Sequence, residues 1–370
     1  MSYLGSTSDK NEVRKIQFTG RSTYILSLPK RWMSEMHLNA GDPVTIVRGS
    51  NNSLSIIPNA ERRPNSANEV TAIVLQNESG SSLKRKVVSM YLAGYNIMHM
   101  KSKTGRISPS QRDSVREVVR RNLVGTEIIA DASDLIIIQV LLSIPELSVD
   151  SAVRRMFLIS TAMHTDAMTC LAEHNRELAA TIVQSDDEVD RFSLYILRNL
   201  VIGLEQNMLH EIGLRGISDC LSYRVVVRSI ERVADHAAGI ANKCLKIDEK
   251  IPKEVFEKID KMSRFSLTLL KESVEAFLRR DYNLADNIVE KAEDVRVLEN
   301  EIIKLLEKAK TSRNDQYQSI SVNTKLILED LRRTAEHASD IAESAMNETI
   351  GEVIEKTSAE SKAKSSIDVL

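Results

Sequence analysis

The sequence predicts a multidomain protein with three folded parts: a small N-terminal domain of strands, a central α+β domain, and an all-α tandem of two three-helix bundles. Its 370 residues exceed one ordinary domain of about 100–200 residues. Aromatic residues make up only 4% of the chain and glycine only 13 positions, a composition that favours long helices over a large β-structure. From about residue 151 the apolar pattern is helical and repeats within itself.

The composition also excludes several classes of protein. The chain has 50 Lys and Arg against 52 Asp and Glu, so it lacks the overall positive charge by which some proteins bind nucleic acids over their whole surface. Its three cysteines form no CxxC pair, which argues against a zinc ribbon or a disulfide framework and for reduced thiols. The strongest apolar run, Leu135–Ile144, is shorter than the ~20 residues of a membrane span, and the N-terminus is polar. We therefore expect a cytoplasmic protein without membrane insertion.

Residues 12–58 form the predicted strand domain, in which two strand pairs flank a short helix. Turn residues separate the strands, and Pro29 can begin the helix because a first-turn proline loses no hydrogen bond. A unit of this size buries little core alone, so we expect it to pair with a second copy. The expected elements are strands at Val13–Phe18, Ser22–Leu28, Pro43–Val47 and Leu54–Ile57, with the helix at Lys30–Met36.

Positive charge gathers at the start of this domain, where residues 10–31 hold six Lys and Arg side chains and one acid, Glu12. Such side chains can contact DNA phosphates, and arginine can also read guanine edges; the alternative is a solvated basic face. The segments R-K-I-Q-F-T-G-R-S-T-Y-I-L-S-L-P-K-R-W (14–32) and L-N-A-G-D-P-V (38–44) resemble the SpoVT/AbrB swapped-hairpin domain. That resemblance implies a homodimer, or a higher assembly, that binds double-stranded DNA. The DNA contacts it implies are Arg14, Lys15, Arg21, Lys30 and Arg31.

A polar linker, residues 59–68, precedes the central α+β domain of residues 69–150. Strand and helix signals alternate in this domain in the order β-α-β-α-β-β. Ser108, with Gln111 three residues later, forms a capping-box pattern that predicts a helix start at Pro109. The sequence of this domain contains no phosphate loop, GxGxxG motif or nucleophile elbow, so its chemistry is unassigned.

The helical part, residues 151–354, contains an internal repeat. A shift of 106 residues aligns Ile182 with Ile288, and further on a shift of 101 aligns His236 with His337. Each copy predicts three helices of about 25–30 residues, which suits an antiparallel bundle. The matched histidines indicate a shared structural role, and the alternative is that they bind a metal. Residues 355–370 are rich in Ser, Ala and Lys and are expected to be disordered.

The third helix of the first copy holds two carboxylates, Glu231 and Asp235, which lie on one helical face because they are four residues apart. Like charges at this spacing repel unless a cation with oxygen ligands neutralises them. The alternative is a solvated acidic face paired with Arg228 or Arg232. Further acids at residues 186–190, near the expected start of the second helix, either suit the helix dipole or extend a cation site.

The segment E-R-V-A-D-H-A-A-G-I-A, residues 231–241, resembles the E-R-x-x-D-H-A-x-x-I-A signature of PhoU domains. The repeat over about residues 153–347 resembles the tandem of three-helix bundles in that family. PhoU carboxylates bind metal, so the resemblance implies a divalent or trivalent ion (iron, zinc or magnesium) at Glu231 and Asp235. In the second copy Arg332 and Glu336 replace the expected Glu and Asp, and Asp340 offers a shifted pair with Glu336.

Together the two resemblances imply the archaeal type of phosphate uptake regulator, in which an AbrB-like domain precedes a PhoU domain. The implied function is transcriptional control of phosphate uptake or related ion-transport genes, with the helical part sensing a metal or a partner. The alternative is an adaptor that inhibits a phosphate transporter, through its ATPase, or a sensor kinase by protein contact. No Ser/His/Asp or Cys/His arrangement in the sequence supports catalysis, so we do not expect an enzyme.

Overall fold

The computed structural model describes ten stretches of the chain, which fall into two compact units, Met1–Ser66 and Ala67–Leu370. Arg21, most of the predicted linker 59–68 and the predicted tail 355–370 lie outside the described residues. The described stretches are residues 12–20, 23–36, 38–48, 53–58, 68–103, 105–142, 147–206, 208–247, 251–310 and 315–354.

The first unit has the predicted order of two strands, a short helix and two strands. Each strand pair is an antiparallel two-stranded sheet, β1 with β2 and β3 with β4, and these two pairs form separate sheets. The first two strands are shorter than expected. The elements are β1 (Gln17–Thr19), β2 (Thr23–Ile25), α1 (Lys30–Glu35), β3 (Val44–Arg48) and β4 (Leu54–Pro58).

The first unit buries almost no side chain of its own. Among the residues of this unit whose exposure the structure describes, Pro29 alone is buried. Large apolar side chains on both hairpins face solvent: Tyr24 is 72% exposed and Ile46 is 63% exposed. Phe18 and Tyr24 contact each other edge to face, with ring centroids 5.1 Å apart, but nothing in the described unit covers them. A single copy of this unit therefore lacks the core that normally stabilises a domain.

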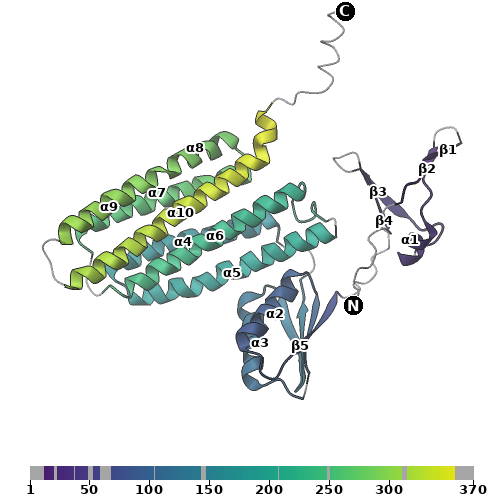
Figure 1. Ribbon diagram of the computed structural model, residues 1–370, viewed down its shortest axis with the longest axis horizontal. Coiled ribbons are helices and arrows are strands. Elements are labelled where there is room, and N and C mark those ends of the chain that lie inside the picture. Colours follow the sequence, from purple (N-terminus) through teal and green to yellow (C-terminus); the bar gives the residue numbers. More distant parts are fainter. Residues whose placement is uncertain are drawn as a thin grey trace, which may run out of the picture. The chain divides into compact units, whose positions relative to one another are not determined.

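The second unit begins with a four-stranded sheet of order β5-β6-β8-β7, in which only β5 and β6 are parallel. Figure 1 shows α2 and α3 on one side of this sheet. Met98 and Met100 of β6 are fully buried, and the capping box of Ser108 and Gln111 starts α3 as predicted. The elements are β5 (Glu69–Val74), α2 (Gly80–Leu92), β6 (Ile97–Ser102), α3 (Pro109–Asn122), β7 (Thr126–Asp131) and β8 (Leu135–Val140).

The remainder of the second unit is helical and confirms the predicted tandem repeat (Figure 1). The second copy differs from the expected three helices, because its middle helix is interrupted at Glu293. The backbone there keeps helical angles, and Arg296 N–H donates to Glu293 O, so the interruption is one tight turn. The helices are α4 (Val149–Glu173), α5 (Arg176–Glu205), α6 (Ile217–Cys244), α7 (Lys253–Arg279), α8 (Tyr282–Ala292), α9 (Asp294–Lys310) and α10 (Asp315–Val353).

Matched caps show how closely the two copies agree. The first helix of each copy ends in a left-handed residue, His174 with φ 60° and Arg280 with φ 58°. The next residue caps the following helix: the Asn175 side chain accepts from Leu178 N–H, and the Asp281 side chain accepts from Leu284 N–H. The same local chemistry therefore reverses the chain at the same point of both bundles.

Polar contacts join the two copies and also join the bundle to the sheet. His164 of α4 hydrogen-bonds Ser263 of α7 at 2.8 Å, and α6 packs along α10. Arg198 of α5 donates to the carbonyl of Gly94 at 3.1 Å and to Asn96 Oδ1 at 2.7 Å, which ties α5 to the loop between α2 and β6. Among the described helices, none combines the length and the apolar character needed to cross a membrane.

Candidate functional site

Four carboxylates lie on the adjoining helices α5 and α6, close enough to interact electrostatically. Glu231 and Asp235 project from α6 on one face, as their four-residue spacing predicts. Asp186 and Asp190 of α5 have the same spacing, and each interacts electrostatically with both α6 carboxylates. These two carboxylate pairs, one on each helix, are called the acidic cluster below.

Burial and the charges of neighbouring carboxylates raise the pKa of three acids of this cluster. Burial raises the pKa of Asp186 to about 7, and the nearby charges of Asp235, Asp190 and Glu231 add to the rise. Burial and the two α6 carboxylates raise the pKa of Asp190 to about 6. The pKa of Glu231 is also raised, mainly by burial, although Arg228 opposes the shift. A cation among these carboxylates would relieve the repulsion and favour their ionised forms.

The chemistry of the acidic cluster fits a hard cation, but its carboxylates do not yet form a ligand set. Carboxylate oxygens suit magnesium and also serve iron and zinc, and the buried Oδ1 of Asp186 has no hydrogen-bond partner among the described residues. In the described part of the chain, however, no three His, Cys, Asp or Glu side chains converge closely enough to hold a metal ion. Arg228 pairs with Glu231, and Arg232 pairs with Asp235 at 3.0 Å. A cation would have to displace both arginines.

The second copy places arginines at the matched positions. Arg332 pairs with Glu336 and lies 3.2 Å from Glu299, and Arg333 lies 3.0 Å from Glu336. Asp340 hydrogen-bonds His337 rather than facing Glu336. A cation at Glu336 and Asp340 remains a prediction, and it would have to displace these arginines. The positions that match Asp186, Asp190, Glu231 and Asp235 are Ala292, Arg296, Arg332 and Glu336.

The matched histidines lie where α6 meets α10. The rings of His236 and His337 are stacked, with centroids 5.6 Å apart and planes 25° from parallel. The Nδ1 atom of His236 lies 3.1 Å from Asp330 Oδ1, and Lys243 binds the other oxygen of Asp330 at 2.6 Å. These contacts agree with the shared structural role that the repeat alignment predicts.

The structure corrects one interpretation of the acids at residues 186–190. Helix α5 begins at Arg176, ten residues before Asp186, so these acids lie far beyond the first turn in which a helix dipole acts. Asp187 and Glu188 are exposed, whereas Asp186 and Asp190 are half buried and face α6. The four-residue spacing of Asp186 and Asp190 was the signal that could have distinguished them from their neighbours.

The described DNA-contact candidates of the first unit are all exposed. Arg14 pairs with Glu12, and Arg31 pairs with Glu35 at 2.9 Å within α1. Lys15, two residues before β1, and Lys30, the first residue of α1, are exposed, while Arg21 lies outside the described residues. Exposed pairs of this kind are weak, so they leave the cations accessible to a stronger anion such as a phosphate.

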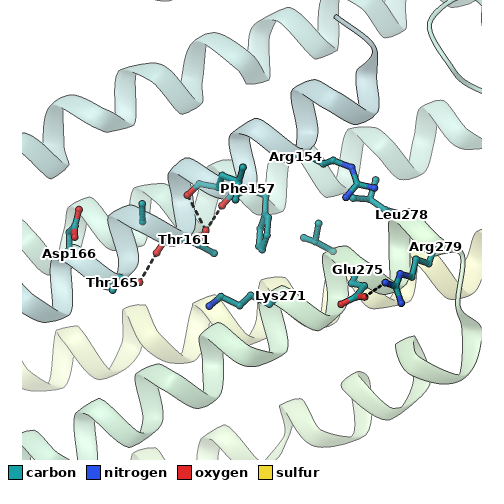
Figure 2. Close-up of a pocket in the computed structure, with 12 residues that line it drawn as sticks. Arg154, Phe157, Thr161, Thr165, Asp166, Lys271, Glu275, Leu278 and Arg279 are labelled. Atoms are coloured by element: carbon teal, nitrogen blue, oxygen red, sulfur yellow. Dashed lines mark hydrogen bonds and ion pairs between the residues drawn. The ribbon is translucent and has the colours of Figure 1, made fainter.

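A separate cavity of about 740 Å³ lies between α4 and α7, the first helices of the two copies. Figure 2 shows Phe157 between these helices, with Arg154 and Arg279 toward one end and Asp166 toward the other. Glu275 neutralises Arg279 at 2.8 Å, whereas Arg154 has no ion-pair partner in the described chain. None of the four acids of the acidic cluster lines this cavity.

Comparison with known families explains the shared architecture of the two copies. The model described as PhoU domain matches residues 153–244 and again residues 259–345. The helical part is a tandem of two PhoU domains. The acidic cluster belongs to the first PhoU domain and the arginine-rich counterpart to the second. A second model, described as "Antidote-toxin recognition MazE, bacterial antitoxin", matches residues 17–64, so a MazE/AbrB-like domain precedes the PhoU domains.

Curated proteins and a solved structure resemble the PhoU part of the chain. The Thermotoga maritima phosphate-specific transport system accessory protein PhoU homolog 1 is 26% identical over 51% of this chain and 80% of its own length. A PhoU homolog of Streptococcus pneumoniae is 26% identical over 51% of this chain and 86% of its own. The crystal structure of PhoU from Pseudomonas aeruginosa shares the fold, with a TM-score of 0.50 and 21% identity over 55% of this chain and 96% of that one.

Proposed function

We propose that the protein is a homodimeric, DNA-binding regulator of genes for phosphate uptake or related ion transport. The observation that carries the proposal is the joining, in one chain, of a MazE/AbrB-like strand unit and two PhoU domains. The strand unit offers exposed basic side chains to DNA, and the relatives of the PhoU part are named accessory proteins of phosphate-specific transport. The role is regulatory and not catalytic.

Dimerisation would supply the core that the strand unit lacks. Exposed apolar side chains on both hairpins, including Tyr24 and Ile46, would be buried when the hairpins of two copies interleave. Light scattering of the full-length protein tests this step: the wild type should have twice the mass of one chain. Ile46→Lys places a charge in the expected interface and should lower the dimer fraction. A wild-type monomer at micromolar concentration would contradict the swapped-hairpin arrangement.

DNA binding would depend mainly on contacts to phosphates by Arg14, Lys15, Arg21, Lys30 and Arg31 in both copies. If about six to eight phosphates are neutralised, log affinity should fall against log salt with a slope near −5 to −7. Genome-wide mapping of the DNA bound at high and low phosphate tests the proposal as a whole. Enrichment at promoters of phosphate or ion transport genes supports it, and an absence of enriched sites at both phosphate levels opposes it.

The first PhoU domain would sense a cation through the acidic cluster. Glu231 and Asp235 would bind it together with Asp186 and Asp190, and iron, zinc or magnesium suits such oxygen ligands. Binding would require Arg228 and Arg232 to release their carboxylates. A weaker site at Glu336 and Asp340 would compete with arginines in the second domain.

A second candidate function is that of an adaptor that inhibits a transporter ATPase or a sensor kinase by contact. The names of the relatives, accessory proteins of a phosphate-specific transport system, favour it. The two functions differ in their need for the strand unit. A variant with Arg14→Ala and Lys15→Ala should lose regulation if DNA binding is required, and should keep it if the protein acts only by contact with a partner.

A further inference from the structure

Three arginines form a ladder on α6 beside the acidic cluster. Arg224, Arg228 and Arg232 are each four residues apart, so they project from one helical face. All three line a cavity of about 450 Å³ to which α10 contributes His337 and Asp340. The three arginines of the ladder therefore line one cavity together and are not merely a row of solvent-exposed side chains.

The charged side chains that line this cavity are mostly positive. Asp340 is its only lining acid among the described residues, and Asp340 already hydrogen-bonds His337 at 3.1 Å. Arg224 has no ion pair in the described chain. Arg228 and Arg232 have only their pairs with Glu231 and Asp235, three residues away on the same helix. Both pairs join neighbours on one helix and both arginines are about half exposed, so a better-placed anion can replace the carboxylates.

The rest of the lining suits a small, oxygen-rich anion. Ser193 of α5 and Ser229 of α6 add hydroxyl donors to the cavity wall, and both residues are largely buried. Guanidinium groups bind phosphate-like oxyanions through two parallel N–H···O bonds, which gives arginine an advantage over lysine for this ligand. Hydroxyl and guanidinium donors together can serve several oxygens of one tetrahedral ion.

We propose that this cavity binds an inorganic oxyanion of the phosphate class, and that a cation in the acidic cluster strengthens the binding. The coupling follows from shared groups: Glu231 and Asp235 cannot serve both a metal and the arginines. When a cation takes the two carboxylates, Arg228 and Arg232 are free to turn toward the anion. The coupling rests on the proposed cation site, whereas the anion site itself rests on the arginine ladder alone.

The second PhoU domain does not repeat the ladder. The positions that match Arg224, Arg228 and Arg232 under the shift of 101 are Lys325, Glu329 and Arg333. An acid thus stands in the middle of the counterpart face, and Lys325 lies 3.7 Å from Glu307. We therefore expect one oxyanion per chain.

Calorimetric titration of the full-length protein with inorganic phosphate, at fixed ionic strength, tests the site. Arg224→Gln removes a guanidinium without breaking an ion pair and should weaken phosphate binding at least tenfold. Arg154→Gln removes a similarly exposed, unpaired arginine from the other cavity and should change nothing. A wild type that binds no phosphate, with or without magnesium, overturns the anion site, as does an unchanged affinity in Arg224→Gln.

The proposed coupling between cation binding and phosphate binding is tested by measuring phosphate affinity with and without magnesium. Phosphate should bind more tightly with saturating magnesium than with a chelator, and Asp235→Asn, which releases Arg232, should bind phosphate tightly even with the chelator. Phosphate affinity that is independent of magnesium in the wild type rejects the coupling and leaves the anion site in place. Metal retained by a protein that binds no phosphate rejects the anion site and leaves the proposed cation sensor in place.

Discussion

In the first PhoU domain, four carboxylates share the junction of its second and third helices, whereas the matched positions of the second domain carry two arginines, an alanine and a glutamate. The apolar positions and helix caps of the two domains nevertheless agree. Packing of the bundle depends on the matched apolar residues, while the site depends on a few polar positions that packing leaves free. The four matched positions are therefore all acidic in the first domain, whereas in the second domain Arg332 and Arg333 pair with the acids beside them.

The largest expected effect of this difference is on bound metal. Replacing Glu231 and Asp235 by alanine should lower the metal content of the purified protein at least tenfold, because two of the four carboxylates are lost. Replacing Glu336 and Asp340 by alanine is the matched control and should leave most of the metal bound. Mass spectrometry of protein purified without chelators measures both. If the Glu231 and Asp235 variant binds as much metal as the wild type, the cation site is wrong. If both double variants lose metal equally, the two domains do not differ in metal binding.

The next effect concerns stability in the second domain. Arg332 is four-fifths buried and lies between Glu299 and Glu336, so Arg332→Met leaves Glu299 without its ion pair, while Glu336 keeps Arg333 at 3.0 Å. We expect the free energy of unfolding to fall by about 1–3 kcal/mol, the usual cost of an unpaired, partly buried polar group. Arg228→Met in the first domain removes a half-exposed partner and should cost about 0–1 kcal/mol. Denaturant unfolding compares the two, and equal losses would show that the domains do not differ in this way.

A third effect is a pH dependence that comes from Asp186 of the first domain. The pKa of Asp186 rises from its ordinary value near 3.8 to about 7, so the folded state binds more protons than the unfolded state between these pH values. Stability of the cation-free protein should therefore fall as the pH rises from about 4 to about 7. Asp186→Asn removes this penalty and should raise the Tm at pH 8 by about 2–4 °C, the shift expected for about 1 kcal/mol if the two PhoU domains unfold together as a unit of about 150–250 residues.

Melting curves in a chelating buffer at pH 5 and pH 8 measure this effect. The advantage of Asp186→Asn should almost disappear at pH 5, because the wild-type carboxyl is then protonated. Saturating cation should also abolish the advantage at pH 8. An Asp186→Asn variant that is less stable than the wild type at pH 8 in the chelator would contradict the proposed repulsion.

The smallest expected effect is at the contact between the domains. His337→Gln removes one ring of the stacked pair but keeps a polar group that can bind Asp340. We expect a loss of about 0.5–1 kcal/mol in unfolding free energy, the size of one aromatic contact, with unchanged metal content. His236→Gln should behave alike, since the two histidines are matched. Loss of metal in either variant would assign the histidines to the cation site instead.

The strand unit shows how much of a fold the local sequence can predict. Its element order follows from turn residues and from Pro29, and the prediction is confirmed. Its lack of a core was also expected, because fewer than 50 residues cannot cover both hairpins. The repeat was likewise readable from matched apolar positions, although the tight turn at Glu293 was not.

At the site, the shared face of Glu231 and Asp235 could be predicted, because helical periodicity is local and four residues complete about one turn. The position of Asp186 and Asp190 near them could not, since the face that α5 presents to α6 depends on packing of the whole bundle. The same packing stacked His236 on His337 and placed the α6 arginines in a cavity closed by α10. Contacts between helices depend on the apolar core, so no local pattern of charged residues could specify them.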